Sequence, residues 1–260
     1  MPATTDTEGQ TSFQDHFSAQ SAAYQEYRPR YPPALFAALA SAAPARGTAW
    51  DAGCGNGQAS LALAEHFAVV HATDASAEQI ARAEPHPRVR YAVAPAEQSG
   101  LPASSIDLVL AAQALHWFHF ERFHTEARRV ARPGAVICAI AYELAEINPA
   151  IDTVVRHFYK ADIGPYWPAD RAHIETGYRD IPWPHSPMNL GPFAMQAEWT
   201  LKQFIGYLGT WSAVARYRSA TGADPLPAVQ AALSSLWAEP EVPRKVEWPL
   251  VILSGRLDPG

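Results

Sequence analysis

The sequence predicts an α/β protein whose central sheet is mostly parallel and covered by helices on both faces. In the first half of the chain, short β-rich runs alternate with segments of helical spacing, a pattern typical of a doubly wound parallel sheet. The run AVICAIA at 135–141 is apolar at every position, as expected of a strand buried on both faces. The chain has 260 residues, of which 48% are hydrophobic and 18% charged, so it can bury a large core.

The expected elements follow one another in a regular order. Strands are expected at 48–53, 68–74, 89–94, 106–112 and 135–141, with a closing strand at 245–256. Helices are expected at 57–67, 76–83 and 120–131, and then near 149–161, 200–218 and 225–237. Ser76 is placed to cap the second of these helices.

The pattern changes after about residue 143. Six of the eight tryptophans lie beyond this point, and prolines are dense in runs such as IPWPHSP. The closing strand is as β-like as the first five, so one domain is expected over 13–260. Within it, 143–195 is expected to be an insertion that forms a helical lid over the substrate. Residues 1–12 are polar and are expected to be disordered.

Composition excludes several classes of partner. The formal net charge of −6 argues against nucleic acid and anionic lipid. Two cysteines are too few for a disulfide scaffold, and no run is long and apolar enough for a membrane helix. The first residues lack the pattern of a signal peptide. A cytoplasmic protein is therefore expected, as a monomer or homodimer and with no metal site.

The stretch WDAGCGNGQAS at 50–60 places three glycines at alternate positions after a carboxylate. A dinucleotide loop needs a third glycine where Gln58 stands, and a phosphate-binding P-loop needs a Gly-Lys-Ser/Thr that is missing here. A simple turn explains one glycine but not three beside Asp51. D-x-G-x-G-x-G after a first strand is typical of class I S-adenosylmethionine-dependent methyltransferases, which this sequence resembles.

This resemblance implies a Rossmann-like, seven-stranded sheet whose last strand is antiparallel, with S-adenosyl-L-methionine as cofactor and S-adenosyl-L-homocysteine as product. Asp51 is expected to bind the cofactor's ammonium group, and bare backbone at Gly53 and Gly55 to carry its methionine end. The expected loop contacts are Asp51, Ala52, Gly53, Cys54, Gly55 and Gln58.

Asp74, 23 residues after Asp51, ends the second strand and fits the carboxylate that accepts the ribose hydroxyls. Its alternative role is to cap the next helix, a place that Ser76 already fills; Ala75 follows as a further cofactor contact. The resemblance assigns the adenine contact to Ala96 and Glu97. Pro95 replaces the aspartate of many relatives, which shifts the expected contact to the backbone of Ala96.

Two further segments resemble the type 11 methyltransferases, a group that includes the yeast trans-aconitate methyltransferases. In the run QALHWF, the resemblance makes Gln113, Ala114 and Trp117 cofactor contacts. His116 in the same run is the candidate catalytic residue, as a general base. The alternative is a histidine that fixes this loop by hydrogen bonding. His119 stands where the group usually has an acidic residue.

Upstream, YQEYRPRYP at 24–32 resembles the N-terminal segment of the same group. Tyr24, Arg28 and Tyr31 are expected to cap the methionine end of the cofactor, with Arg28 as a carboxylate partner. Aromatic residues are expected to line the acceptor pocket. The candidates are Tyr31, Tyr142, Tyr166, Trp167 and Trp211. Four cationic side chains could pair with an acidic acceptor, the alternative being that they are solvated surface groups: Arg156, Arg171, Arg179 and His157.

The expected function is methyl transfer by in-line displacement to an oxygen atom, a carboxylate oxygen included, or a nitrogen atom of a small-molecule metabolite. Such a reaction needs positioning and desolvation more than a catalytic triad. A protein that binds the cofactor only to sense it would show the same loop. A nucleic-acid or protein methyltransferase is a further alternative, although Asp/Asn-Pro-Pro-aromatic is absent after the fourth strand.

Overall fold

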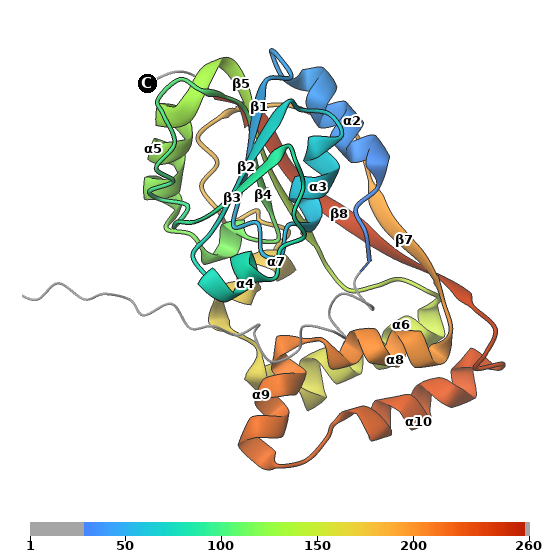
Figure 1. Ribbon diagram of the computed structural model, residues 1–260. Helices are drawn as coiled ribbons and strands as arrows, with labels where there is room; N and C mark the ends of the chain where they lie inside the picture. The colour runs from blue at the N-terminus through green and yellow to red at the C-terminus, as the bar shows by residue number, and fades with distance from the viewer. Residues whose placement is uncertain (1–28, 258–260) are drawn as a thin grey trace, which may run out of the picture.

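The computed structural model describes residues 29–257, and an α/β layer and a helical unit make up this part of the chain (Figure 1). The strands are β1 (Thr48–Ala52), β2 (Val69–Asp74), β3 (Val89–Val93), β4 (Ile106–Ala112), β5 (Ala131–Tyr142), β6 (Ser186–Pro187), β7 (Ala194–Trp199) and β8 (Arg244–Arg256). The α-helices are α2 (Pro33–Ala42), α3 (Gln58–Ala64), α4 (Ala77–Ala81), α5 (Phe120–Val130), α6 (Pro149–His157), α7 (Ala172–Glu175), α8 (Leu201–Gly209), α9 (Ser212–Thr221) and α10 (Leu226–Trp237).

The sheet confirms the predicted fold class. Within the described residues its strands run in the order β3-β2-β1-β4-β5-β8-β6. β1 to β5 pair in parallel, and β8 pairs antiparallel with β5. The chain reverses its direction of travel across the sheet between β1 and β4, and ligands bind at such a switch point, outside the carboxyl ends of the strands. These ends face the helical unit in Figure 1.

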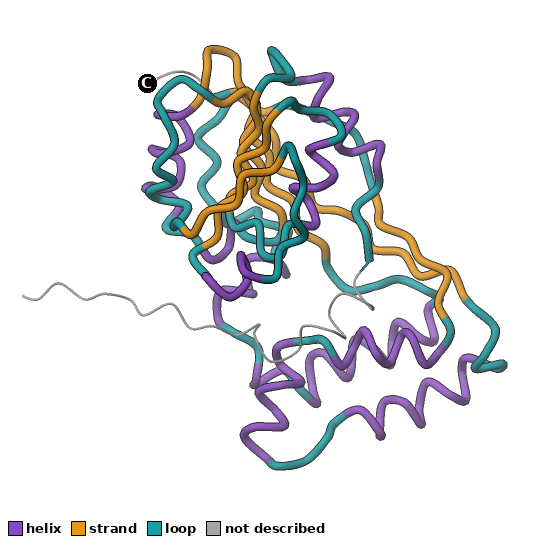
Figure 2. Tube along the Cα trace, in the orientation of Figure 1, coloured by secondary structure: helices purple, strands orange, loops and turns teal. Residues whose placement is uncertain are grey.

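Alternation along the buried strands supplies a core on each face of the sheet. Leu108 and Leu110 of β4 pack with residues of α2 and α3, whereas Val109 packs with Phe123 and Ala127 of α5 on the other face. Figure 2 shows the sheet between these helices. The two faces are covered in a doubly wound arrangement, as the alternating sequence predicts.

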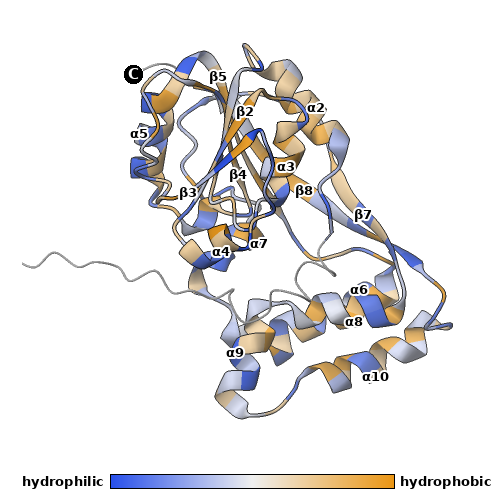
Figure 3. Cartoon of the chain, viewed as in Figure 1, coloured by the Kyte–Doolittle hydropathy of each residue, from blue (hydrophilic) through white to orange (hydrophobic). Residues whose placement is uncertain are grey.

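The apolar residues of α5 define the face of this helix that packs against the sheet. Phe123, Ala127 and Val130 recur at helical spacing and are buried, while Arg122 and Arg129 remain exposed. The hydropathy colouring of Figure 3 shows both kinds of residue on this helix. The helix ends at Val130, because Pro133 and Gly134 follow within one turn.

The helical unit has an apolar core of its own, and two separate stretches of chain build it. α6 and the turns after it come from the first stretch, and α8, α9 and α10 come from the second. Phe204, Trp211, Leu233 and Trp237 are buried between them. The outer half of β8 runs from this unit to the sheet and pairs with β7 (Figure 1).

Several details differ from the predicted elements. The helix expected over 200–218 is divided into α8 and α9, because Trp211 has extended backbone (φ −70°, ψ 134°) and its ring is buried. α6 ends at His157 and continues as a π-helical turn, Phe158–Asp162. β6, β7 and α2 were not anticipated, since the two strands acquire their structure by pairing with β8.

Candidate functional site

The glycine loop is fixed underneath and open above. The backbone N–H groups of Gly53 and Cys54 donate to the carbonyl oxygen of Thr73 over 2.8 and 3.0 Å, which fastens the loop to β2. Gly53 has φ 68°, and a Cβ atom there would stand 2.7 Å from the Cβ of Ala114. Gly55 has φ 55°, but a Cβ atom there would meet no atom of residues 29–257 within 4 Å. The upper side of the loop is therefore a cradle of bare backbone.

Asp51 is the penultimate residue of β1, and its carboxyl group is fully buried. Its Oδ2 accepts a hydrogen bond of 2.6 Å from the Ser60 hydroxyl, while Oδ1 has no partner within residues 29–257. Burial raises the pKa of Asp51 to about 7, against the opposing effect of the Ser60 hydrogen bond and with a smaller contribution from Asp74. A buried carboxylate oxygen without a donor suits a cationic ligand.

Asp74 lies at the end of β2 and joins that strand to the loop. One carboxylate oxygen accepts the Gly55 N–H and the other the Ser76 N–H, both over 2.8 Å. The cap of α4 is Ser76, whose hydroxyl accepts the N–H of Gln79. Asp74 thus stands beside the open part of the loop without serving as the helix cap. Ala75 separates the two residues in the same turn.

The chain after β4 turns sharply beneath the loop. Gln113 has φ 54°, its N–H donates to Ile140 over 2.7 Å, and its side-chain amide donates to the Tyr142 carbonyl over 3.3 Å. Ala114 lies under Gly53, as described above. A 3-10 helix, η2 (Leu115–Trp117), follows, and the Trp117 side chain is 37% exposed at its end.

The residues expected to contact adenine differ in their exposure. Ala96 is buried, whereas Glu97 is half-buried and its carboxylate accepts the N–H of His119 over 2.7 Å. His119 is the cap of α5. Glu97 therefore has a partner in the protein, and the Ala96 backbone remains as the predicted adenine contact.

His116 is buried below the carboxyl end of β4. Its Nδ1 lies 2.8 Å from the Tyr178 hydroxyl. Burial lowers the pKa of His116 to about 3, helped by the charges of Arg171 and His173. The ring is neutral at ordinary pH and is a weak base.

All five aromatic candidates belong to the apolar core of the helical unit or pack against it, but their rings do not stack as a single group. Trp167 and Trp211 lie 5.6 Å apart between ring centroids, and both contact Tyr159. Tyr166 packs instead against Tyr217, at 5.0 Å. Two further candidates, Tyr31 and Tyr142, pack against the core of the helical unit, and Tyr31 also contacts Phe36. Tyr24 and Arg28 lie outside the described residues.

The sequence motifs do not reveal the contacts of three residues near the site. Tyr159, Arg171 and Tyr178 all come from the stretch after α6, which lacks periodicity. Tyr159 and Arg171 contact the Trp167 ring, and Tyr178 bonds His116. Only the folded chain brings them beside η2.

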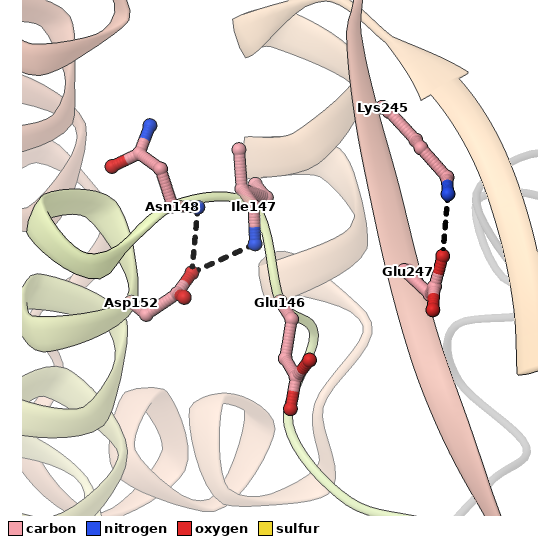
Figure 4. A pocket seen from close by; sticks show the side chains of 6 residues that line it. All are labelled: Glu146, Ile147, Asn148, Asp152, Lys245 and Glu247. Atoms are coloured by element: carbon pink, nitrogen blue, oxygen red, sulfur yellow. Dashed lines mark hydrogen bonds and ion pairs between the residues drawn. The ribbon is translucent and has the colours of Figure 1, made fainter.

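An open cavity of about 340 Å³ lies at the outer end of β8, away from the loop (Figure 4). Asp152 there accepts the backbone N–H groups of Ile147 and Asn148, and Glu247 pairs with Lys245. These carboxylates stabilise a chain turn and a strand. Within residues 29–257, no helix is long and apolar enough to cross a membrane.

The strand order, the open glycine loop and the carboxylates that end β1 and β2 define the fold and cofactor loop of class I methyltransferases. Residues 50–139 match the family model of a methyltransferase domain. A Dictyostelium discoideum protein named as a methyltransferase is 32% identical over 227 residues, which cover 86% of this chain and 86% of that protein.

A Saccharomyces cerevisiae protein named as an S-adenosylmethionine-dependent methyltransferase is 26% identical over 172 residues, covering 61% of this chain and 59% of its own. A solved structure from Anaeromyxobacter dehalogenans, named as a type II methyltransferase, shares 51% identity and superposes with a TM-score of 0.85. It covers 90% of this chain and 100% of its own. The chain belongs to the type 11 family of class I methyltransferases, enzymes whose methyl donor is S-adenosyl-L-methionine.

Proposed function

We propose that this methyltransferase moves a methyl group by in-line displacement to an oxygen atom, a carboxylate oxygen included, or a nitrogen atom of a small-molecule metabolite. The observation that carries the proposal is the position of the open loop, with Asp51 and Asp74, opposite a helical unit rich in aromatic rings. Bound S-adenosyl-L-methionine supplies a methyl group on a sulfonium.

The residues present fit this cofactor. The free Oδ1 of Asp51 suits the ammonium group, and the bare backbone at Gly55 suits a ligand that lies close to the loop. Asp74 would accept the ribose hydroxyls, and the Ala96 backbone would contact adenine. Ala52, Cys54, Gln58, Ala75, Glu97, Gln113, Ala114 and Trp117 complete the proposed contacts, with Tyr24 and Arg28 outside the described residues.

The protein's contribution to the reaction is to position the groups and exclude water. Alignment of two reacting groups can lower a barrier by about 7–11 kcal/mol, so no triad is required. Aromatic rings favour a nearby cation and keep the site dry. We propose that 143–195 acts as the lid, together with the second stretch of the helical unit. Tyr31, Tyr142, Tyr166, Trp167 and Trp211 remain the proposed acceptor residues.

His116 is proposed to hold the loop after β4 through its bond to Tyr178, because a buried ring with a pKa of about 3 is a poor base at neutral pH. At saturating concentrations of cofactor and acceptor, the turnover rate is then expected to be flat between pH 5.5 and 8. An acid limb with an apparent pKa near 6 that disappears in His116→Asn would restore the general-base role.

The decisive experiment incubates the protein with labelled S-adenosyl-L-methionine and a panel of small carboxylic acids, phenols and amines. Labelled methyl product and S-adenosyl-L-homocysteine should appear together with one class of acceptor. Asp74→Ala should weaken cofactor binding at least about tenfold, since a charged hydrogen bond contributes about 1.5–3 kcal/mol. Exposed Glu239 provides the control, Glu239→Ala.

The results separate the enzyme from a sensor. Tight cofactor binding with no transfer to any acceptor would favour the sensing alternative, which shares the loop. Unchanged affinity in Asp74→Ala would contradict the ribose assignment. Absence of cofactor binding by calorimetry would refute both functions.

A further inference from the structure

Arg171 is held rigidly beside the proposed acceptor site, and its orientation has a direct structural cause. Its Nε–H donates to the Tyr159 hydroxyl over 2.8 Å, and that hydroxyl in turn donates to Glu175 over 2.8 Å. The guanidinium carbon lies 4.2 Å from the centroid of the Trp167 ring. One hydrogen bond and one stacking contact therefore fix the plane of the guanidinium.

The outer edge of the same guanidinium is unused. Within residues 29–257, its two terminal nitrogens, Nη1 and Nη2, have neither a hydrogen-bond acceptor nor an ion-pair partner. Glu175 accepts from Tyr159 and forms no ion pair with Arg171. The carboxylate of Glu175 therefore acts on Arg171 only through the Tyr159 hydroxyl, and the half-buried terminal nitrogens have lost hydration that an anion can replace.

The position of Arg171 connects it to the cofactor loop. It belongs to a 3-10 helix, η5 (Ala169–Arg171), which packs against η2 at the carboxyl end of β4. The pKa of His116 is lowered mainly by burial and, to a smaller extent, by the positive charge of Arg171. Ala114, just before η2, lies directly below Gly53. The arginine thus stands across η2 from the loop.

We propose that Arg171 binds a carboxylate of the methyl acceptor, which makes the acceptor a small organic anion with a flat unsaturated or aromatic body. The two Nη atoms present parallel N–H groups that match a carboxylate in bidentate geometry. The half-buried ring of Trp167 provides the surface for the flat body, and the buried rings of Tyr159 and Trp211 pack behind it. This inference rests on the proposed function, because it concerns the acceptor of the same site.

Arg156 provides a contrast within the helical unit. Arg156 on α6 is exposed and has no ring or hydroxyl contact within the described residues. It therefore serves as a matched control for charge. Arg171 itself allows two substitutions, since Arg171→Gln removes the charge and Arg171→Lys keeps the charge but loses the planar pair of donors.

The test measures binding in the presence of S-adenosyl-L-homocysteine by calorimetry, with cinnamate and sorbate against cinnamamide and sorbamide. The wild-type protein should bind at least one carboxylate about 10- to 100-fold more tightly than its amide, as expected for charged hydrogen bonds. Arg171→Gln should abolish that preference, Arg171→Lys should retain part of it, and Arg156→Gln should leave it intact. The affinity for S-adenosyl-L-homocysteine should stay the same in all variants.

A purely structural arginine would give a different result. Arg171→Gln would then lower the melting temperature and weaken the carboxylate and the amide equally. That outcome, or a wild-type protein that binds S-adenosyl-L-homocysteine but prefers no carboxylate, would overturn the anion site. Failure of the wild-type protein to bind S-adenosyl-L-homocysteine would instead refute the proposed function.

Discussion

Cofactor affinity should fall on acidification, because Asp51 must be ionised to bind an ammonium group. Burial raises the pKa of Asp51 to about 7 in the cofactor-free protein, so about half of the molecules carry a protonated Asp51 at pH 7. At pH 5.5 only about 3% are ionised, and the observed affinity should be about 15-fold weaker than at pH 7. Below pH 7 the ligand's own amino group stays protonated and does not contribute.

Calorimetry of S-adenosyl-L-methionine binding at pH 7 and 5.5 measures this change. Binding at pH 7 should also release about half a proton per ligand, which appears as a dependence of the enthalpy on the buffer. Asp51→Asn should bind weakly at both pH values, and adenosine, which lacks the ammonium group, should show no such dependence in the wild-type protein. An affinity that changes less than threefold, with no proton released, would refute the assignment of Asp51.

The remaining predictions concern the loop, the buried histidines and Tyr91. Gly55→Val should lower the melting temperature, because left-handed backbone costs a residue with a side chain about 1–2 kcal/mol. The same substitution should abolish cofactor binding in calorimetry, and full affinity would place the cofactor elsewhere. Burial lowers the pKa of His124 to about 4 and of His185 to about 3 in the folded protein. Below pH 6.5 the unfolded chain therefore binds more protons than the folded protein, and the free energy of unfolding falls as the pH is lowered. Urea denaturation should show that the free energy of unfolding is lower at pH 5 than at pH 7 by about 1–2 kcal/mol per histidine, allowing for partial screening. The decrease should be smaller in His185→Asn, and an equal decrease in both proteins would contradict this. Tyr91→Phe should not lower the melting temperature, because the buried Tyr91 hydroxyl has no partner within residues 29–257; a fall of several degrees would show that it has one.

The elements that the sequence predicts well are those whose signal is contiguous. The five parallel strands are short apolar runs, and each is stabilised by neighbours that carry the same pattern. The positions of Asp51 and Asp74 can be predicted for the same reason, because each lies at the end of such a run. The spacing of the helix and strand between them then brings both to one edge of the sheet.

The contacts of the proposed acceptor side could not be predicted in this way. Arg171 and Tyr178 lie in a stretch of short turns, where no periodicity shows which side chains point inward. Their partners Tyr159 and His116 are 12 and 62 residues away along the chain. β7 likewise exists only because β8 extends beyond the sheet and offers it an edge. Contacts of such long range follow from packing and leave no local pattern.

The two sides of the site differ in what holds them, and this difference bears on how the enzyme selects its acceptor. The cofactor side is fixed by backbone hydrogen bonds from Gly53, Cys54 and Gly55, so substitutions elsewhere disturb it little. The proposed acceptor side is made of side chains, namely stacked rings and an arginine whose terminal nitrogens have no partner within residues 29–257. If the acceptor binds at Arg171 and Trp167, substitutions there are expected to change the acceptor without disturbing the loop, because within the described residues the hydrogen bonds of both side chains go to Tyr159. A common donor site combined with variable acceptors is then a physical consequence of placing the two sites on separate parts of the fold.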